Sequence, residues 1–225
     1  MEEEKLVDII WHGHACFELR GTSTTIVIDP FEGLGIPEPQ ASADLVLCSH
    51  SHSDHNNADP VLKKGGTVLE GFVGTQVVAR VPVTGIATYH DAQEGSQRGT
   101  NSVYVLQLDG LQFCHLGDLG HDLTTPQVTA IGAIDVLFTP VGGGPTIDPE
   151  TAAAIVQRLR PRIIVPMHYN AEIPAQSPWM SARLRKVDDF LAKSNDIVEH
   201  RATRAFTITK DELPKAPKII ILTLT

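Results

Sequence analysis

The first half of the chain alternates short apolar runs with glycine, proline and acidic residues, a pattern that predicts strands joined by turns. β-branched residues are frequent in these runs, which favours strand over helix. We expect strands at residues 7–11, 15–19, 25–28, 45–48, 67–69, 76–79 and 85–89. One short helix is expected at residues 59–65, because Asp59 and Pro60 are typical of a helix start and Gly65 of a helix end.

The second half of the chain mixes strands with more helices. Residues 102–108 and 111–115 are joined by Asp109 and Gly110, which predicts a β-hairpin. Further strands are expected at residues 136–138 and 162–165, and helices from residue 125, at residues 149–159 and at residues 177–193. Strand-rich halves that are each followed by helices predict an α/β or α+β sandwich in which helices cover two sheets.

Size and composition are those of an ordinary globular domain, with 225 residues, 42% hydrophobic and 20% charged. We therefore expect one domain spanning residues 1–225. No apolar run approaches the roughly 20 residues that cross a bilayer, so we expect no membrane association. Residues 1–5 are too acidic for a signal peptide, so we expect a cytoplasmic protein. Cys16, Cys48 and Cys114 are expected to be reduced thiols in the core.

The net charge of −9 disfavours a partner that is bound chiefly through a phosphate backbone, so we do not expect nucleic acid as a partner. A small anionic substrate stays compatible with this charge, because bound divalent cations would create a local positive field. The sequence does not fix the oligomeric state, and a homo-oligomer is compatible with it.

Four residues with metal-binding side chains lie within the short run from His50 to His55, directly after the apolar residues 45–48. Imidazole and carboxylate are ligands that Zn²⁺ and its first-row neighbours accept. In an extended segment His50 and His52 point to the same side and can bind one ion, whereas the adjacent Asp54 and His55 diverge unless the chain turns. A turn there would direct the second pair toward a neighbouring ion.

Three further candidates, His90, Asp118 and His168, each follow a predicted strand at the point where it gives way to a loop. Four ligands hold two ions poorly, so these residues are candidates to complete a two-metal site. Each has an alternative: a surface histidine for His90, a turn former beside Gly117 for Asp118, and a packed side chain for His168. His115 is the rival to His90, although its place within an alternating strand favours a core or supporting role.

The His-x-His-x-Asp-His run, the later isolated histidine, the Gly-Asp after a strand and the last histidine resemble the metallo-β-lactamase superfamily of metal-dependent hydrolases. The segments Trp11–Ala15, Ile28–Pro30 and Ile164–Tyr169 resemble more closely its branch of hydrolases akin to the ascorbate-6-phosphate lactonases. The resemblance covers essentially the whole chain. One departure is that the third histidine of many members lies in a His-x-x-Gly-His run, whereas residues 89–95 here do not contain one.

This resemblance implies a four-layer αββα sandwich with a dinuclear site along one edge. Its implied ligands are His50, His52 and His90 for the first ion, Asp54, His55 and His168 for the second, and Asp118 between the two. The implied cofactors are two divalent ions, with Zn²⁺ favoured and Mn²⁺ or Fe²⁺ acceptable to the same ligands.

Three other polar residues are candidates for supporting or substrate-contacting roles. His14, in a Gly-His turn, either lines the site or hydrogen-bonds a loop. Asp29, at a strand end, either orients a ligating imidazole or forms a turn with Pro30. His121 is a candidate pocket contact, and residues 142–144 are read as a plain turn because no phosphate-loop pattern accompanies their glycines.

The ligand set leads to a hypothesis of hydrolysis by a metal-bridged hydroxide, with Asp54 as ligand and proton acceptor and an ester, lactone or phosphoester as the cleaved bond. No Gly-x-Ser-x-Gly nucleophile pattern is present. The alternatives are a phosphodiesterase or ribonuclease acting on nucleic acid and a non-catalytic metal-binding scaffold. A di-iron redox protein with a flavin domain is disfavoured, because 225 residues leave no space for that domain.

Overall fold

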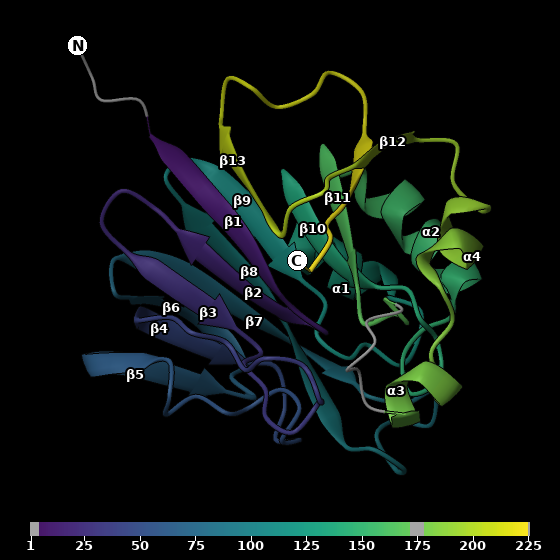
Figure 1. Cartoon of the computed structure of the whole chain (residues 1–225), viewed down its shortest axis with the longest axis horizontal. Coiled ribbons are helices and arrows are strands. Elements are labelled where there is room, and N and C mark those ends of the chain that lie inside the picture. Colours follow the sequence, from purple (N-terminus) through teal and green to yellow (C-terminus); the bar gives the residue numbers. More distant parts are fainter. Residues whose placement is uncertain (1–4, 172–177, 225) are drawn as a thin grey trace.

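Two β-sheets packed face to face form the centre of the molecule in the computed structural model, which describes residues 5–171 and 178–224 (Figure 1). The six-stranded sheet has the order β13 (Ala205–Thr209), β1 (Leu6–Gly13), β2 (Cys16–Arg20), β3 (Thr25–Ile28), β4 (Ala43–Cys48) and β5 (Leu62–Glu70). The eight-stranded sheet has the order β12 (Ile197–His200), β14 (Lys218–Ile221), β11 (Ile163–Met167), β10 (Val136–Pro140), β9 (Leu111–His115), β8 (Thr100–Leu108), β7 (Val81–Tyr89) and β6 (Gly74–Val78).

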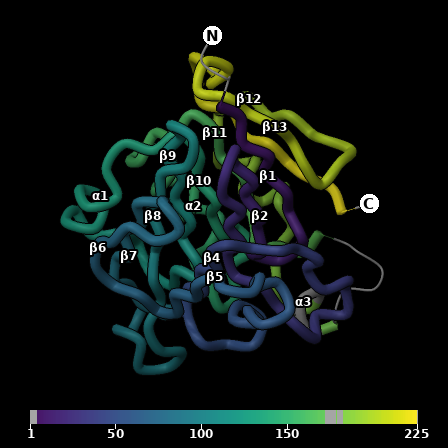
Figure 2. Tube along the Cα trace, turned by 90° about the vertical axis from the view of Figure 1, so that its left-hand side faces the viewer, coloured from purple at the N-terminus to yellow at the C-terminus, as the bar shows by residue number. Residues whose placement is uncertain are grey.

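The core lies between the two sheets, whose facing side chains are almost all apolar and buried. Phe17 of the six-stranded sheet packs against Phe138 of the eight-stranded sheet, with ring centroids 4.2 Å apart. Figure 2 views the sandwich from the side and shows β1 and β2, in purple, beside β8 and β9, in teal. This tightly packed interior fixes the positions of the strand ends, from which the loops at one edge depart.

The hairpin predicted from Asp109 and Gly110 is confirmed, with Leu108 paired to Leu111 across the turn. Both turn residues have positive φ, 48° for Asp109 and 85° for Gly110, as this tight turn requires. The seven strands predicted in the first half and those at residues 136–138 and 162–165 are also present, with boundaries shifted by a few residues.

The helices α1 (Thr125–Ile131), α2 (Pro149–Leu159), α3 (Pro178–Arg183) and α4 (Val187–Leu191) lie on the side of the eight-stranded sheet (Figure 1). The α/β sandwich predicted from the sequence is confirmed. Among the described residues, loops rather than a helix cover the outer face of the six-stranded sheet. Phe31, Leu34 and Ile36 pack there against Cys16 and Cys48.

The helix predicted at residues 59–65 is wrong. One turn forms, in which the N–H groups of Val61 and Leu62 both donate to the Ala58 carbonyl, and the chain then enters β5. Parallel pairing with β4 outweighs the local helix signals, and Gly65 with φ of 83° lies where the register shifts between the two strands. A tertiary contact therefore decides the conformation of this segment.

The long helix predicted at residues 177–193 is wrong in its middle, and its first residue lies outside the described part of the chain. The segment is split into α3 and α4 because the N–H of Arg185 donates to the Gly142 carbonyl, and the Arg185 carbonyl accepts from the Asn170 N–H. These bonds tie the break between the helices to two loops near the end of β11. The three strands after residue 196 were not predicted.

The three cysteines are buried and unpaired, as expected, and burial raises the pKa of each thiol. None of the helices in the described ranges is long and apolar enough to cross a bilayer.

Candidate metal centre

The loop after β4 brings the first group of histidines together. His50 Nε2 lies 3.0 Å from His52 Nδ1, and the rings of His50 and His90 lie 4.8 Å apart between centroids. His90 follows β7 directly, so residues from two different sheets meet here. His50 and His90 are buried, whereas His52 is exposed at the surface of the cluster.

A second group surrounds the carboxylate of Asp118, which follows β9. Its Oδ2 atom lies 3.3 Å from His90 Nε2 and 3.2 Å from His168 Nε2, and its Oδ1 atom lies 3.3 Å from His55 Nε2. Asp54 Oδ2 lies 3.8 Å from His55 Nε2. The structure thus gathers all seven side chains predicted as ligands at one edge of the sandwich, with Asp118 between the two groups.

His14, left open by the sequence, also lies in the cluster. Its Nε2 atom is 3.1 Å from His55 Nε2 and 3.4 Å from Asp54 Oδ2, and its ring packs on that of His168 with centroids 4.2 Å apart. His14, His55 and His168 form a group of buried ring nitrogens within 4.8 Å of one another.

Both ring nitrogens of His115 have other partners, which removes the rival to His90. His115 Nε2 donates to the Ala15 carbonyl over 2.9 Å, and its Nδ1 accepts from the Gly117 N–H over 3.1 Å. The ring is fully buried beneath the cluster and supports the turn that presents Asp118. His90 is therefore the histidine whose position fits the first group.

Asp29 holds two of the histidines in orientation. Its Oδ2 atom accepts from His55 Nδ1 over 2.9 Å and from the Ser49 hydroxyl over 2.8 Å, and Ser49 Oγ lies 2.9 Å from His50 Nδ1. Because the Ser49 proton goes to the carboxylate, His50 Nδ1 donates to Ser49, and the Nε2 atoms of both histidines face the cluster. The predicted orienting role of Asp29 fits this geometry.

Two supporting residues were missed by the sequence reasoning, Ser49 and Asn101. Asn101 Nδ2 donates to the Thr88 hydroxyl and the Leu116 carbonyl, and its Oδ1 accepts from the Asp118 N–H over 2.9 Å. Gly117 has φ of 56°, and a Cβ atom there would lie 2.3 Å from Asn101 Oδ1. Isolated polar residues of this kind carry no motif, so only their buried contacts reveal them.

The loop after His90 differs from the His-x-x-Gly-His run that is common in the superfamily the sequence resembles. The Asp91 carboxylate accepts four backbone N–H bonds, from Gln93, Gly95, Gln97 and Arg98, at 2.7 to 3.0 Å. These bonds close the loop on itself next to His90. The departure from the common motif thus has a structural counterpart, in which Asp91 fixes the backbone of this loop.

Three residues at the cluster have left-handed backbone conformations that cost non-glycine residues free energy. The φ angles are 53° for His14, 50° for Asp29 and 52° for His168. Such conformations cost on the order of 1–3 kcal/mol each and persist where the surroundings impose them. Their concentration here is typical of a functional site.

The imidazoles of His50 and His14 are neutral at neutral pH. Burial and the charge of His55 lower the pKa of His50 to about 3, and burial together with His168 lowers the pKa of His14 to about 4. Their nitrogen lone pairs are thus available to a cation, because only a deprotonated imidazole binds metal.

The buried charges of the cluster compensate one another. Burial opposes ionisation of Asp118, yet the imidazoles of His168 and His55 hold its pKa well below the ordinary value. Burial would lower the pKa of His55, but the carboxylates of Asp118 and Asp29 raise it well above the ordinary value. Without a metal, the His55 imidazolium supplies the positive charge between two carboxylates.

The donor set fits a divalent transition metal. Several buried polar atoms of the cluster make no hydrogen bond of good geometry within the described residues, namely Nδ1 of His14 and His90, both ring nitrogens of His168, and Asp118 Oδ1. Unpartnered buried polar atoms are costly unless something compensates them. The 3.0 and 3.1 Å separations between imidazole nitrogens approach the roughly 3.3 Å edge of a tetrahedron with Zn–N bonds of about 2.0–2.1 Å.

The remaining candidates lie beside the cluster rather than in it. His121 lines a cavity of about 440 Å³ with Gly143 and Arg185, which agrees with its predicted pocket contact. Residues 142–144 approach the end of β11, and a Cβ atom at Gly142 would lie 2.2 Å from the His168 carbonyl oxygen. This close approach, rather than a phosphate-binding loop, accounts for a glycine at that position.

Comparison with known proteins agrees with this geometry. A family model described as a β-lactamase superfamily domain matches residues 8–168. A UPF0173 metal-dependent hydrolase of Thermococcus onnurineus is 31% identical over 225 residues, which cover 86% of this chain and 100% of that protein.

Solved structures share the fold. A chain from Thermotoga maritima, described as a Zn-dependent hydrolase of the metallo-β-lactamase superfamily, has a TM-score of 0.78 and 35% identity and covers 97% of this chain and 100% of its own. CmlA, a diiron β-hydroxylase from Streptomyces venezuelae, has a TM-score of 0.58 at 16% identity over 93% of this chain and 55% of its own, which shows a common fold alone. The chain therefore belongs to the metallo-β-lactamase superfamily and, within it, to the UPF0173 family of metal-dependent hydrolases.

Proposed function

We propose that this chain hydrolyses an ester, lactone or phosphoester bond of a small, anionic substrate with the help of two divalent ions. The observation that carries the proposal is the convergence of histidines from separate strand ends on the two oxygens of Asp118. The resemblance to ascorbate-6-phosphate lactonases supports the lactone and phosphorylated sugars as first choices among substrates.

The ions would be held by three histidines on one side of Asp118 and a mixed set on the other. The first set is His50, His52 and His90, and the second is Asp54, His55 and His168. When bound, such ions would polarise the electrophile and lower the pKa of a water molecule toward neutrality. Zn²⁺ suits this imidazole-rich set best, and Mn²⁺ or Fe²⁺ are acceptable to it.

Asp54 is the residue suited to accept the proton of the attacking water. Its side chain is 25% exposed, whereas that of Asp118 is 2% exposed, so Asp54 is the carboxylate that solvent and substrate can reach. Burial opposes its ionisation, but the imidazoles of His14 and His55 hold its pKa well below the ordinary value. Asp54 is thus a carboxylate at neutral pH. Its lowered pKa makes it a weak base, so a proton it accepts would pass on to the solvent that reaches its partly exposed side chain.

Substrate would enter beside His52, the exposed member of the first group. Ser51 and Ser53 flank it and are exposed as well. The buried ring of His50 lies next to it, with centroids 4.6 Å apart, so a substrate at His52 would contact the cluster on its buried side. Partial exclusion of water strengthens the electrostatic interactions between the substrate and the charged groups of the cluster.

The test is a substrate screen on purified protein loaded separately with Zn²⁺, Mn²⁺ and Fe²⁺. Lactones, carboxylic esters, phosphorylated sugars and phosphodiesters form the small-molecule arms, and a structured RNA forms the nucleic-acid arm. We expect turnover in at least one small-molecule arm, with loss of activity after chelation and recovery on adding metal. Turnover of RNA alone, with binding that falls steeply with salt, would replace the proposal with a nuclease function.

A further inference from the structure

His14 is the side chain of the cluster to which the sequence motifs assign no ligand role. It comes from the turn between β1 and β2, far in sequence from the other histidines, and its ring is buried. Its Nε2 atom points at the same space as the Nε2 atom of His55, 3.1 Å away, and at Asp54 Oδ2, 3.4 Å away.

The fold holds His14 in this place through its backbone. The His14 carbonyl accepts from the Trp11 indole over 3.1 Å and from the His168 N–H over 3.2 Å. Trp11 in turn stacks on Tyr169, with ring centroids 5.7 Å apart. The turn after β1 and the end of β11 are thus joined at His14, which fixes the backbone that carries the imidazole.

The protonation pattern of the neighbours decides what His14 can do. His55 donates its Nδ1 proton to Asp29, so a neutral His55 presents a lone pair on Nε2. A metal at the second position would occupy that lone pair, and His55 Nε2 could then accept no hydrogen bond from His14. The atom of His14 that faces the ion is its own Nε2, whose distance to His55 Nε2 fits two ligands of one ion.

We propose that His14 Nε2 is a ligand of the second ion, which makes the two metal positions unequal. The second position then has the imidazoles of His14, His55 and His168 together with the carboxylates of Asp54 and Asp118. All three of its histidines are buried. The first position has three imidazoles and the carboxylate of Asp118, which lies between the two positions. The imidazole of His52 in this first group is exposed. This inference rests on the proposed dinuclear centre. It adds that the second ion binds more tightly than the first, and that the first ion is the one with a coordination position open to substrate.

The most direct experiment is NMR of the full-length protein loaded with an NMR-active cadmium isotope and labelled with nitrogen isotope at histidine. A scalar coupling between cadmium and a ring nitrogen appears only where the two are bonded. We expect coupling at His14 Nε2 as well as at His55 and His168. Coupling at His55 and His168 without coupling at His14 would overturn this inference alone, and absence of coupling at all three would overturn the dinuclear centre itself.

A His14→Gln variant gives an independent readout through metal content. We expect the affinity for one of the two Co²⁺ ions to fall about 100-fold or more, because loss of a ligand costs more than the 10–100-fold that loss of a ligand's hydrogen-bond partner costs. The Co²⁺ absorption spectrum should also change. The matched control is His12→Gln, two residues earlier at the end of β1, because His12 bonds Glu18 over 3.0 Å outside the cluster. Two ions bound with unchanged affinity in His14→Gln would contradict the inference, and the NMR measurement needs no variant to fold.

Discussion

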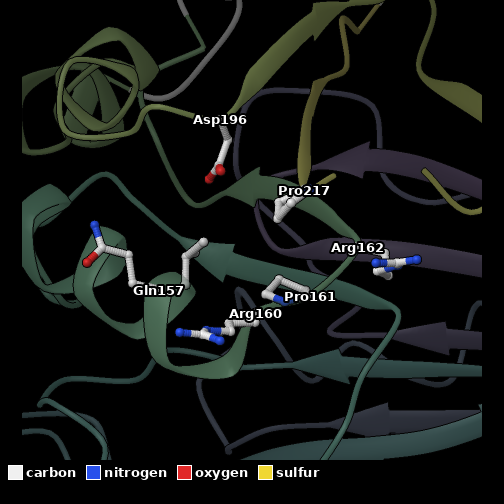
Figure 3. Close-up of a pocket in the computed structure, with 7 residues that line it drawn as sticks. Gln157, Arg160, Pro161, Arg162, Asp196 and Pro217 are labelled. Carbon is white, nitrogen blue, oxygen red and sulfur yellow. The ribbon is translucent and has the colours of Figure 1, made fainter. Parts of the chain in front are cut away.

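The strands β10 and β11 carry a polar cavity or cluster at each end, and the two ends differ in kind. At the carboxyl end, His168 joins ring nitrogens and carboxylates that point at one another over 3.1 to 3.8 Å. At the amino end lies a cavity of about 530 Å³ lined by Gln157, Arg160, Arg162 and Asp196. Figure 3 shows the guanidinium groups of Arg160 and Arg162 directed away from each other.

Convergence of donors, rather than cavity volume, distinguishes the edge of the sandwich that is proposed to hold the ions. Arg162 Nη1 donates to the Lys215 carbonyl over 3.0 Å, so its hydrogen bond is made within the protein rather than kept for a ligand. At the carboxyl end, buried polar atoms of His168 and Asp118 make no hydrogen bond of good geometry among the described residues. These atoms are a reason to expect a bound ligand at the carboxyl end of the strands.

The largest expected effect comes from removing a residue of the convergent edge that is open to substrate. His52→Ala and Asp54→Asn should each lower turnover about 1000-fold or more, since several kcal/mol of transition-state stabilisation depend on the ions. The free energy of unfolding of the metal-free protein should change little, because both side chains are at least partly exposed. The measurement is steady-state kinetics on the substrate found by the screen, with metal content determined on the same sample.

Either variant with full activity and full metal content would contradict the role given to the convergent edge.

A smaller effect is expected from the residues that orient the ligands. Asp29→Asn should weaken metal binding by about 10–100-fold, because an amide cannot hold both the His55 ring and the Ser49 hydroxyl as the carboxylate does. Ser49→Ala should have the same direction and a smaller size, since it frees only His50. Competition with a chromophoric chelator measures both affinities, and equal affinities in wild type and Asp29→Asn would rule out the orienting role.

The metal-free protein should lose stability as pH falls from 6.5 to about 4. His50 and His14 have folded pKa values of about 3 and about 4 against 6.5 in the unfolded chain. The unfolded chain therefore binds protons at these positions within that window and the folded chain does not, which favours unfolding by on the order of 4 kcal/mol between pH 7 and pH 5. Urea unfolding at pH 7 and pH 5 measures this change.

His55, whose folded pKa is raised, contributes stability that is present below 6.5 and is lost only at higher pH, so it does not reverse the sign. A His50→Gln variant should flatten the pH dependence, and metal-free stability that is constant between pH 7 and pH 5 would contradict this account of the cluster.

The smallest effect is expected at the amino end of β10 and β11, beside the cavity shown in Figure 3. Arg160 ends α2 in a left-handed conformation with φ of 49°, where glycine is the usual residue. Arg160→Gly should raise the free energy of unfolding by about 0.5–1 kcal/mol through relief of that conformation and leave turnover unchanged. A loss of turnover in this variant would show that the cavity in Figure 3 takes part in the reaction and would end the contrast between the two edges.

The sequence was most informative where the chemistry is local. The run from His50 to His55 shows its metal-binding character through spacing alone, and the strands that precede His90, Asp118 and His168 indicate that these residues lie at sheet edges. The Asp109-Gly110 turn signal was enough to predict the hairpin, and alternation within its second strand predicted the inward position of His115. In these cases each residue is positioned by its own strand, so short-range pattern and final structure agree.

The sequence was least informative where contacts between distant segments decide. Residues 59–65 carry helix signals, but pairing with β4 makes most of them a strand. The role of His14 depends on its distance to His55 and His168, and that of Ser49 on a carboxylate twenty residues away. No local pattern encodes such distances, and the strands after residue 196 likewise depend on neighbours such as β1 and β11.

Anomalous diffraction from crystals of the Zn²⁺-loaded protein tests the central claim most directly. The account predicts two zinc peaks on either side of Asp118, one among His50, His52 and His90 and one among Asp54, His55 and His168, at full occupancy after dialysis against trace zinc. A single peak, or peaks only outside this edge of the sandwich, would contradict the claim that these strand ends converge to hold a pair of ions.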